Sequence, residues 1–232
     1  SFPTRRSSDL ITQSSNNPAI QGGFTFSHKS GAYVALWGSS VDFNTPGVST
    51  ETDISLGYTN TLKLSDTLAP TYDVGVIRYG YIGSDSKFTN PYNGDTGFDF
   101  TEFYGKLTFA DSLFKGDALS VGVNYSNDYW GHSDEFWYFN VGYSAPIADT
   151  GFTGLASVGY NKLKNKDSLL VVAGGPGEDD SYIDYKVGVN YNILGIVAEL
   201  DVVGTDISTS GMTDAQKKPY DTGLVFSLTK TF

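Results

Sequence analysis

Residues 223–232 read Gly-Leu-Val-Phe-Ser-Leu-Thr-Lys-Thr-Phe and end the sequence. The even-numbered residues Leu224, Phe226, Leu228 and Phe232 are large and apolar, with Lys230 as the exception. The odd-numbered positions hold Val225 and the small residues Gly223, Ser227, Thr229 and Thr231. Because a strand turns alternate side chains to opposite faces, this stretch predicts a strand with one apolar and one small, polar face. A soluble β-sandwich and a membrane barrel both contain such strands, so the remaining chain has to distinguish them.

The composition limits the class of protein. The chain has 232 residues, the size of one all-β domain, and its 16 Tyr, 15 Phe and 27 Gly suit many strands with tight turns. The absence of Cys excludes disulfides and thiolate metal sites, and no metal or cofactor motif is found. The sequence has no run of 18 apolar residues, so no transmembrane helix is predicted. A net charge of -11 argues against nucleic acid as a partner.

The first ten residues, SFPTRRSSDL, resemble the translation of a sequencing adapter. We expect residues 1–10 to be an artefact and residues 11–232 to form a single domain. The alternative is a basic N-terminal arm. In the first interpretation the native N-terminus, with any export signal, is missing.

Strand-like segments follow one another with no helical period between them. Eleven are predicted, at residues 20–28, 32–42, 51–64, 72–82, 98–110, 118–127, 135–145, 152–163, 181–193, 195–206 and 220–232. Most reach the roughly 9–11 residues that a tilted strand needs to cross a bilayer. From Ile183 to Ile193 every odd-numbered residue is apolar, one of several unusually clean alternations in the chain.

Three features favour a transmembrane barrel over a sandwich. The polar face carries Gly and Ser rather than long charged side chains, Tyr and Trp gather near strand ends, and the connections alternate between short and long. Short turns at one end and long loops at the other are typical of outer-membrane barrels. If Phe232 lies at the periplasmic rim, the long loops are extracellular.

The predicted fold is therefore an all-β, antiparallel, up-and-down transmembrane β-barrel. Bacterial single-chain barrels have even strand numbers, so eleven evident strands predict about twelve natively, with the first one lost. We expect a gap or poor pairing between residues 20–28 and 220–232. Direct pairing of these two segments along their full length would contradict a missing strand.

The chain resembles the TorF family of porins. The resemblance rests on Gly22-Gly23-Phe24, Ala32–Phe43, Tyr72–Val76, Val121–Ser126, Asp184–Val189 and Val225–Phe232. Phe232 also resembles the C-terminal aromatic of the recognition strand in outer-membrane barrels, which makes Phe226, Leu228 and Phe232 the candidate assembly signal. The resemblance implies location in the bacterial outer membrane and a pore. The expected partners are membrane lipid, lipopolysaccharide, the barrel-assembly machinery and small hydrophilic solutes.

Strand parity predicts which residues line the lumen. The candidates are Asp53, Lys63, Arg78, Glu102, Lys106, Asn124, Asn140, Asp184, Lys186, Glu199 and Asp201. Arg78 is ambiguous, and we place it inward, with Ile77, Tyr79 and Tyr81 outward, because a lipid-facing Arg costs about 2–4 kcal/mol near the midplane. The alternative to a water-filled pore is a lumen closed by pairs such as Glu102–Lys106 or Asp184–Lys186. Mixed charge leaves the ion preference open.

Two loops carry candidate chemistry. His132, with Asp128, Ser133 and Asp134 nearby, could act in catalysis, but we interpret it as a polar loop residue and expect no enzyme. Loop 163–181 either folds into the mouth as a constriction or extends above the membrane as a hairpin, and we favour the hairpin. Its residues 178–180 form a solvated acidic tip rather than a calcium loop.

The leading hypothesis is a passive channel for small hydrophilic solutes. The first alternative is a non-conducting barrel that supports the membrane or binds partners through its long loops. A barrel hydrolase and a soluble sandwich are the remaining alternatives.

Overall fold

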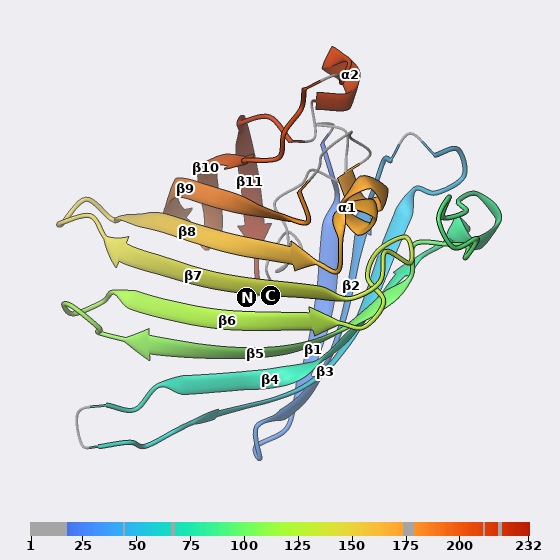
Figure 1. The fold of residues 1–232 in the computed structure, drawn as a ribbon. Coiled ribbons are helices and arrows are strands. Elements are labelled where there is room, and N and C mark those ends of the chain that lie inside the picture. The colour runs from blue at the N-terminus through green and yellow to red at the C-terminus, as the bar shows by residue number, and fades with distance from the viewer. Residues whose placement is uncertain (1–17, 44, 66–67, 174–178, 211, 218–219) are drawn as a thin grey trace.

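The computed structural model of this chain describes residues 18–43, 45–65, 68–173, 179–210, 212–217 and 220–232. They form one antiparallel sheet of eleven strands, each paired with its neighbours in sequence (Figure 1). The strands are β1 (Gln21–Ser27), β2 (Ala32–Ser40), β3 (Thr50–Thr61), β4 (Thr71–Tyr81), β5 (Phe100–Ala110), β6 (Ala118–Ser126), β7 (Phe136–Pro146), β8 (Phe152–Leu163), β9 (Ser181–Ile193), β10 (Ile196–Thr205) and β11 (Gly223–Lys230). The predicted strand number, order and all-β class are confirmed.

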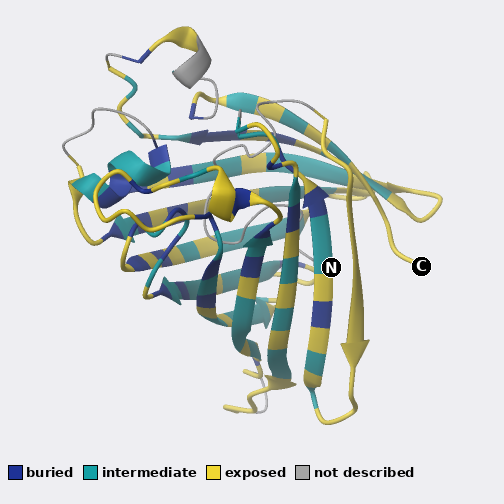
Figure 2. Ribbon diagram, turned by 90° about the vertical axis from the view of Figure 1, so that its right-hand side faces the viewer, coloured by how far each residue is buried: buried dark blue, intermediate teal, exposed yellow. Residues whose placement is uncertain are grey.

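The sheet curves strongly but is not closed. β1 and β11 are its two edges, and the strand order joins neither of them to a second partner. β1 is exposed along its whole length, as Figure 2 shows. The expected lack of pairing between these strands is therefore observed, while the closed barrel remains a prediction.

The connections differ at the two ends of the sheet. One end has the turns 28–31, 62–70, 111–117, 147–151 and 194–195, and the other has the loops 41–49, 82–99, 127–135, 164–180 and 206–222. We call them the turn end and the loop end. The connections are mostly short at one end and mostly long at the other, as predicted, although turn 62–70 is as long as loops 41–49 and 127–135.

The loops contain short helices that the sequence pattern did not predict. They are η1 (Ser84–Ser86), α1 (Lys166–Ala173) and α2 (Asp214–Lys217). The expectation of no helix between strands is therefore wrong at the loop end, where α1 lies among the loops (Figure 1). Within the described ranges, no helix is long and apolar enough to cross a membrane.

The two faces of the sheet differ as the strand parity predicts. Leu56, Val76, Phe103 and Tyr125 form one row across β3 to β6 on the convex face. Many large apolar residues of this face are exposed, including Phe139 at 48%. All acidic residues of the described strands, and most of their serines and asparagines, lie on the concave face. A large apolar face that is exposed in the isolated chain marks an interaction surface.

The hydrophobic core occupies the loop end of the concave face. It combines strand residues with loop residues: Val41, Val48, Tyr79, Tyr81, Phe98, Phe100, Tyr129, Phe136, Tyr138, Leu163, Leu169, Ala173, Tyr182, Met212 and Tyr220. Leu169 and Ala173 come from α1, so this helix packs into the core. The long loops thus fold over the concave face instead of standing away from it.

Candidate functional site: the concave face and its mouth

The charged residues of the strands are separated by sign. Among the described strand residues, the concave face carries seven carboxylates and two lysines: Glu51, Asp53, Asp73, Glu102, Asp184, Glu199 and Asp201 with Lys106 and Lys186. The charged strand residues of the convex face are all basic, namely Arg78, Lys162 and Lys230, and they lie toward strand ends. Every acidic strand residue described thus points to the concave side.

Glu102 of β5 is held by neutral donors from both neighbouring strands. Its Oε2 accepts hydrogen bonds from the Tyr79 hydroxyl at 3.2 Å and from the Asn124 amide at 3.0 Å. Glu102 is 0% exposed. A buried carboxylate needs such donors because its transfer from water is costly. The three side chains therefore form one unit across β4, β5 and β6.

Asp184 has a similar arrangement on the same face, four strands further along the sheet, on β9. Its two oxygens accept from the Tyr138 hydroxyl at 3.3 Å and from the Asn161 amide at 2.7 Å. Tyr138 lies flat over Gly159, where any Cβ would collide with the phenol ring. Glycine at this position is what lets the tyrosine lie along the wall and reach Asp184.

A charged cluster lies on β9 and β10. The Lys186 ammonium is 3.1 Å from Glu199 and 3.9 Å from Asp201, and the Asn190 amide donates to Glu199 at 3.4 Å. One lysine thus lies within 4 Å of two carboxylates.

Asp73 of β4 lies nearer the turn end. It accepts a hydrogen bond from the Tyr33 hydroxyl at 2.8 Å and another from Tyr104 at 3.2 Å, and the two phenols also contact each other. Lys106 is its direct cross-strand partner on β5. Tyrosine hydroxyls therefore bond Glu51, Asp73, Glu102 and Asp184 alike.

Aromatic rings fill the loop end of the concave face. Phe98 stacks on Trp130 with centroids 4.4 Å apart, and it also contacts Phe43 at 5.5 Å and Phe88 at 4.6 Å. These rings come from three different loops. We call these four residues the aromatic plug. The three loops therefore meet at Phe98.

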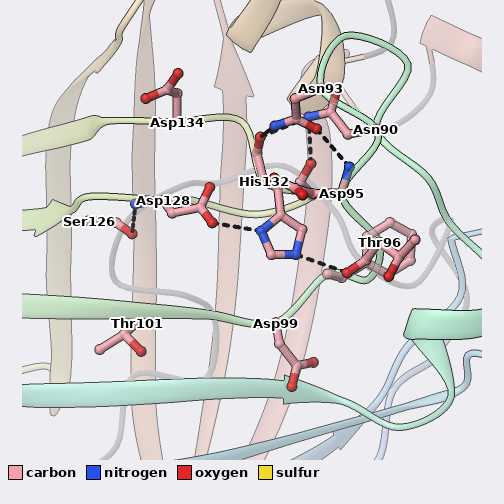
Figure 3. A network of polar contacts seen from close by, with 12 residues as sticks. Asn90, Asn93, Asp95, Thr96, Asp99, Thr101, Ser126, Asp128, His132 and Asp134 are labelled. Atoms are coloured by element: carbon pink, nitrogen blue, oxygen red, sulfur yellow. Dashed lines mark hydrogen bonds and ion pairs between the residues drawn. The ribbon is translucent and has the colours of Figure 1, made fainter.

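His132 joins two of the loops (Figure 3). Its Nδ1 is 2.6 Å from an Asp128 oxygen and its Nε2 is 2.9 Å from the Thr96 carbonyl oxygen. Both partners are acceptors, so both ring nitrogens donate when the imidazole is protonated. Asn90 adds hydrogen bonds to the carbonyls of Gly131 and His132. The histidine is thus part of the docking between loops 82–99 and 127–135.

A hollow of about 490 Å³ lies beside this histidine. Its lining is mostly polar and comes from β4, β5 and the two docked loops: Arg78, Asp85, Thr96, Asp99, Phe100, Thr101, Asn127, Asp128 and His132. No group of three metal-binding side chains occurs among the residues that the structure describes.

The docking of the two loops is expected to depend on pH. Burial by itself lowers the pKa of His132, but the hydrogen bond and charge of Asp128, the Thr96 carbonyl and the charge of Asp95 outweigh it and raise the pKa above 6.5. A raised folded pKa adds stability that is complete below the unfolded pKa and is lost as pH rises through the folded value. Hydrogen exchange in residues 90–97 and 127–135 should therefore rise on the alkaline side, after correction for intrinsic rates.

The matched variant for this measurement is His132→Gln, which keeps an amide donor and cannot titrate. Its loop exchange should show no such step. An equal step in both proteins would contradict the role of the imidazole.

Comparison with known proteins gives one match. Residues 9–232 match a family described as "Bacterial protein of unknown function (Gcw_chp)". The chain belongs to this family. No curated protein and no solved structure matches it.

Most residues that the sequence places in the lumen of this family member lie on the concave face. They are Asp53, Glu102, Lys106, Asn124, Asn140, Asp184, Lys186, Glu199 and Asp201. The pairs Glu102–Lys106 and Asp184–Lys186, expected for a closed lumen, are not the contacts that form. Glu102 and Asp184 bond tyrosine and asparagine instead. Lys63 lies beyond the end of β3 and is exposed.

The inward placement of Arg78 is wrong. Arg78 faces Ile54 and Thr101 on the convex side, and its guanidinium lies 3.4 Å from Asp99. The cost that argued against this placement applies at the bilayer midplane and falls toward the interface. Arg78 lies toward the loop end of β4 and is exposed, so it can avoid that cost.

The same register corrects the placement of three neighbours of Arg78. Ile77, Tyr79 and Tyr81 face the concave side instead of the convex side. The two tyrosines are buried there, where their hydroxyls donate to Glu102 and Glu51. Parity with Asp73 on the same strand was the signal that could have placed them.

Loop 163–181 folds inward. Because Leu169 and Ala173 of α1 pack into the core, the extended hairpin is wrong for residues 166–173, and the constriction stays a prediction. Residues 174–178, with Glu178, lie outside the described residues. Asp180 is paired with Lys162 at 2.5 Å instead of belonging to a free acidic tip.

Sequence reasoning missed the tyrosines and asparagine that bond the acids, namely Tyr33, Tyr104, Tyr138 and Asn161. Their parity was readable, because each shares a face with an acidic or small residue. The sequence analysis also gave no role to the aromatic residues of the plug, because loop residues show no repeating pattern of apolar positions.

Proposed function

We propose that this chain is an outer-membrane β-barrel that acts as a passive channel for small hydrophilic solutes. The observation that carries the proposal is the separation of strand charges. All described acidic strand residues lie on the concave face, and the convex face is apolar between its basic ends. A soluble sandwich requires the opposite, with its large apolar residues facing a second sheet. Only one sheet is found in the described chain.

Aromatic residues at both ends of the convex face support contact with a bilayer. Tyr125 and Trp137 pack together toward the loop end, with centroids 4.6 Å apart. Tyr58 and Tyr72, with centroids 6.1 Å apart, lie toward the turn end. Outer-membrane barrels carry such girdles at both interfaces, where rings meet the lipid head groups. Membrane lipid and lipopolysaccharide are therefore the proposed surroundings of the convex face.

The proposal includes closure of the sheet. An open edge leaves backbone N–H and C=O groups without partners, which hydrocarbon does not tolerate. In the proposed barrel of about twelve strands, one more strand pairs with the free edges of β1 and β11. Phe226, Leu228 and Phe232 are exposed on or beyond β11 and remain the proposed signal for the assembly machinery.

The middle of the concave face supports the channel function. On β6, β7 and β8 the middle of this face consists of small or uncharged polar residues, including Gly122, Asn140, Gly142 and Ser157. Side chains of this size do not fill a barrel of about twelve strands, which is intermediate between filled small barrels and open porins. In this proposal the aromatic plug narrows the extracellular mouth.

Planar-bilayer recording of the refolded full-length protein tests the channel. Discrete conductance steps are expected in KCl. Insertion is shown by protection from external protease in vesicles. If the inserted protein gives no conductance steps, the channel function is contradicted and the barrel proposal stands.

One observation favours a second candidate, a non-conducting barrel that binds partners through its loops. The aromatic plug and α1 pack over the loop end of the concave face. A mouth fully closed by these side chains would keep the barrel silent in the same recording. Silence with intact insertion is therefore the result that supports this candidate.

A further inference from the structure

We propose that the turn end of the sheet anchors the protein in the phospholipid leaflet beside it. The apolar turn tips insert among the lipid head groups, and the lysines next to them contact the lipid phosphates. This inference rests on the proposed barrel in a bilayer and names the partner of its turn end.

Exposed apolar side chains are distributed unevenly between the two ends of the sheet. Four of the five turns carry large apolar residues that are exposed, among them Leu64, Leu113, Phe114, Ile147 and Leu194. At the loop end, where the loops are mostly longer, the described residues include only Ile82 and Tyr92 of this kind. Turn tips in water carry mostly Gly, Pro, Asn, Asp and Ser. The turn end therefore indicates an apolar neighbour.

The backbone of turn 111–117 fixes the exposure of its tip. The buried Asp117 carboxylate accepts hydrogen bonds from the backbone N–H groups of Leu113 at 2.9 Å and Phe114 at 3.3 Å. It also accepts one from the Tyr143 hydroxyl at 2.7 Å. These bonds close the turn, yet Leu113 is 79% exposed. A turn held in this way presents its apolar side chains outward.

The turn between β9 and β10 presents a leucine at the cost of backbone strain. Leu194 and Gly195 both have positive φ, at 53° and 79°. Two-residue hairpin turns with this geometry favour Asn, Asp and Gly, because a larger side chain is strained there. Leu194 is nevertheless 95% exposed, so it gains no packing within the chain. Local strain of this kind is typical of residues with a function.

The apolar tips continue the convex face. In turn 62–70 the Leu62 N–H donates to the Pro70 carbonyl at 2.8 Å, and the Leu64 N–H donates to the Leu68 carbonyl at 3.0 Å. The pairing of β3 with β4 thus extends past the strand ends. Leu62, Leu64 and Leu68 keep the parity of Leu56, which places them on the convex side. They are contiguous with the surface that the proposed function assigns to lipid.

Lysines accompany the apolar tips. Lys63 lies between two of the leucines in turn 62–70, Lys115 follows Phe114, and the Lys230 ammonium lies beside Gly195. All three lysines are exposed. A lysine at a membrane surface lays its stem along apolar groups and directs its ammonium to anionic head groups. An apolar protein surface would match the leucines but not the lysines, so phospholipid is the partner that fits both.

The test uses the absence of cysteine from the chain. Leu113→Cys and Leu194→Cys each give one site for a fluorophore on the refolded full-length protein in lipid vesicles. Lipids with brominated acyl chains should quench both labels. Because one lysine near an anionic surface favours binding by about fivefold, brominated phosphatidylglycerol should associate at residue 113 about fivefold better than brominated phosphatidylcholine. Lys115→Gln in the Leu113→Cys protein should remove this preference.

The matched control is Ser30→Cys, since turn 28–31 carries Lys29 but no large apolar residue. Brominated lipid should quench this label least. Val141→Cys on the convex face reports the membrane location itself. Quenching at residue 141 without quenching at 113 and 194 overturns the anchor and leaves the barrel, as would be seen if a second copy or another protein covered the turns. Equal association of the two lipids also overturns it. No quenching at 141 overturns the proposed membrane location and the inference with it.

Discussion

Replacing Phe98 by alanine is expected to lower the free energy of unfolding by about 3–5 kcal/mol, as for other large aromatic residues removed from a core. Phe98 is 1% exposed and contacts Phe43, Phe88 and Trp130 from three loops. The cavity left by the ring cannot collapse easily, because each partner is held by its own loop. Denaturant unfolding in detergent micelles measures the loss.

Phe103→Ala is the matched control for Phe98→Ala. It removes the same side chain from the convex face, where Phe103 is 54% exposed. In micelles its cost should be less than half that of Phe98→Ala. Equal costs would contradict the aromatic plug as the core of the loop end.

The plug also predicts a change in conductance. If the plug narrows the mouth, Phe98→Ala should increase the single-channel conductance or the open probability relative to wild type. Phe103→Ala should leave both unchanged. A stable Phe98→Ala protein with unaltered conductance would place the constriction elsewhere.

The second large effect is expected from Val141→Arg on the convex face. Val141 lies near the middle of β7 between Val121 and Val158, all three exposed. Arginine at the midplane of a barrel surface costs about 2–4 kcal/mol in a bilayer. Unfolding by urea from lipid vesicles should show this loss, and insertion should become inefficient.

The neighbouring residue supplies the control. Asn140 precedes Val141 on the same strand and faces the concave side, where its side chain is half-buried and lies over Gly122. Asn140→Arg should therefore cost far less in vesicles. If both variants lose the same stability, the convex face does not contact lipid, and the proposed membrane location fails.

The fold could be predicted in detail because its pattern is local. A strand shows alternation with period two within its own length, so residues such as Val187 and Asp184 reveal their faces without knowledge of other strands. Up-and-down order then pairs each strand with the next across a connection. The predicted range 152–163 has the bounds of β8.

The site could be predicted only in part. Parity placed Glu102, Asp184 and Glu199 on one face, but it could not show that tyrosines and asparagines, instead of lysines, bond the first two. Arg78 was misplaced because a general cost was applied without the depth of the residue in the sheet. That depth depends on strand stagger, which no single strand contains.

The sequence by itself determined the strands, their order and which face of most strands is apolar, because these follow from alternation along the chain. The tertiary structure decided what happens at the loop end. There Phe98 stacks on Trp130, His132 hydrogen-bonds to the Thr96 carbonyl, and α1 packs into the core. Such contacts join loops with no period of their own, and their distances are set by the curvature of the sheet that carries them.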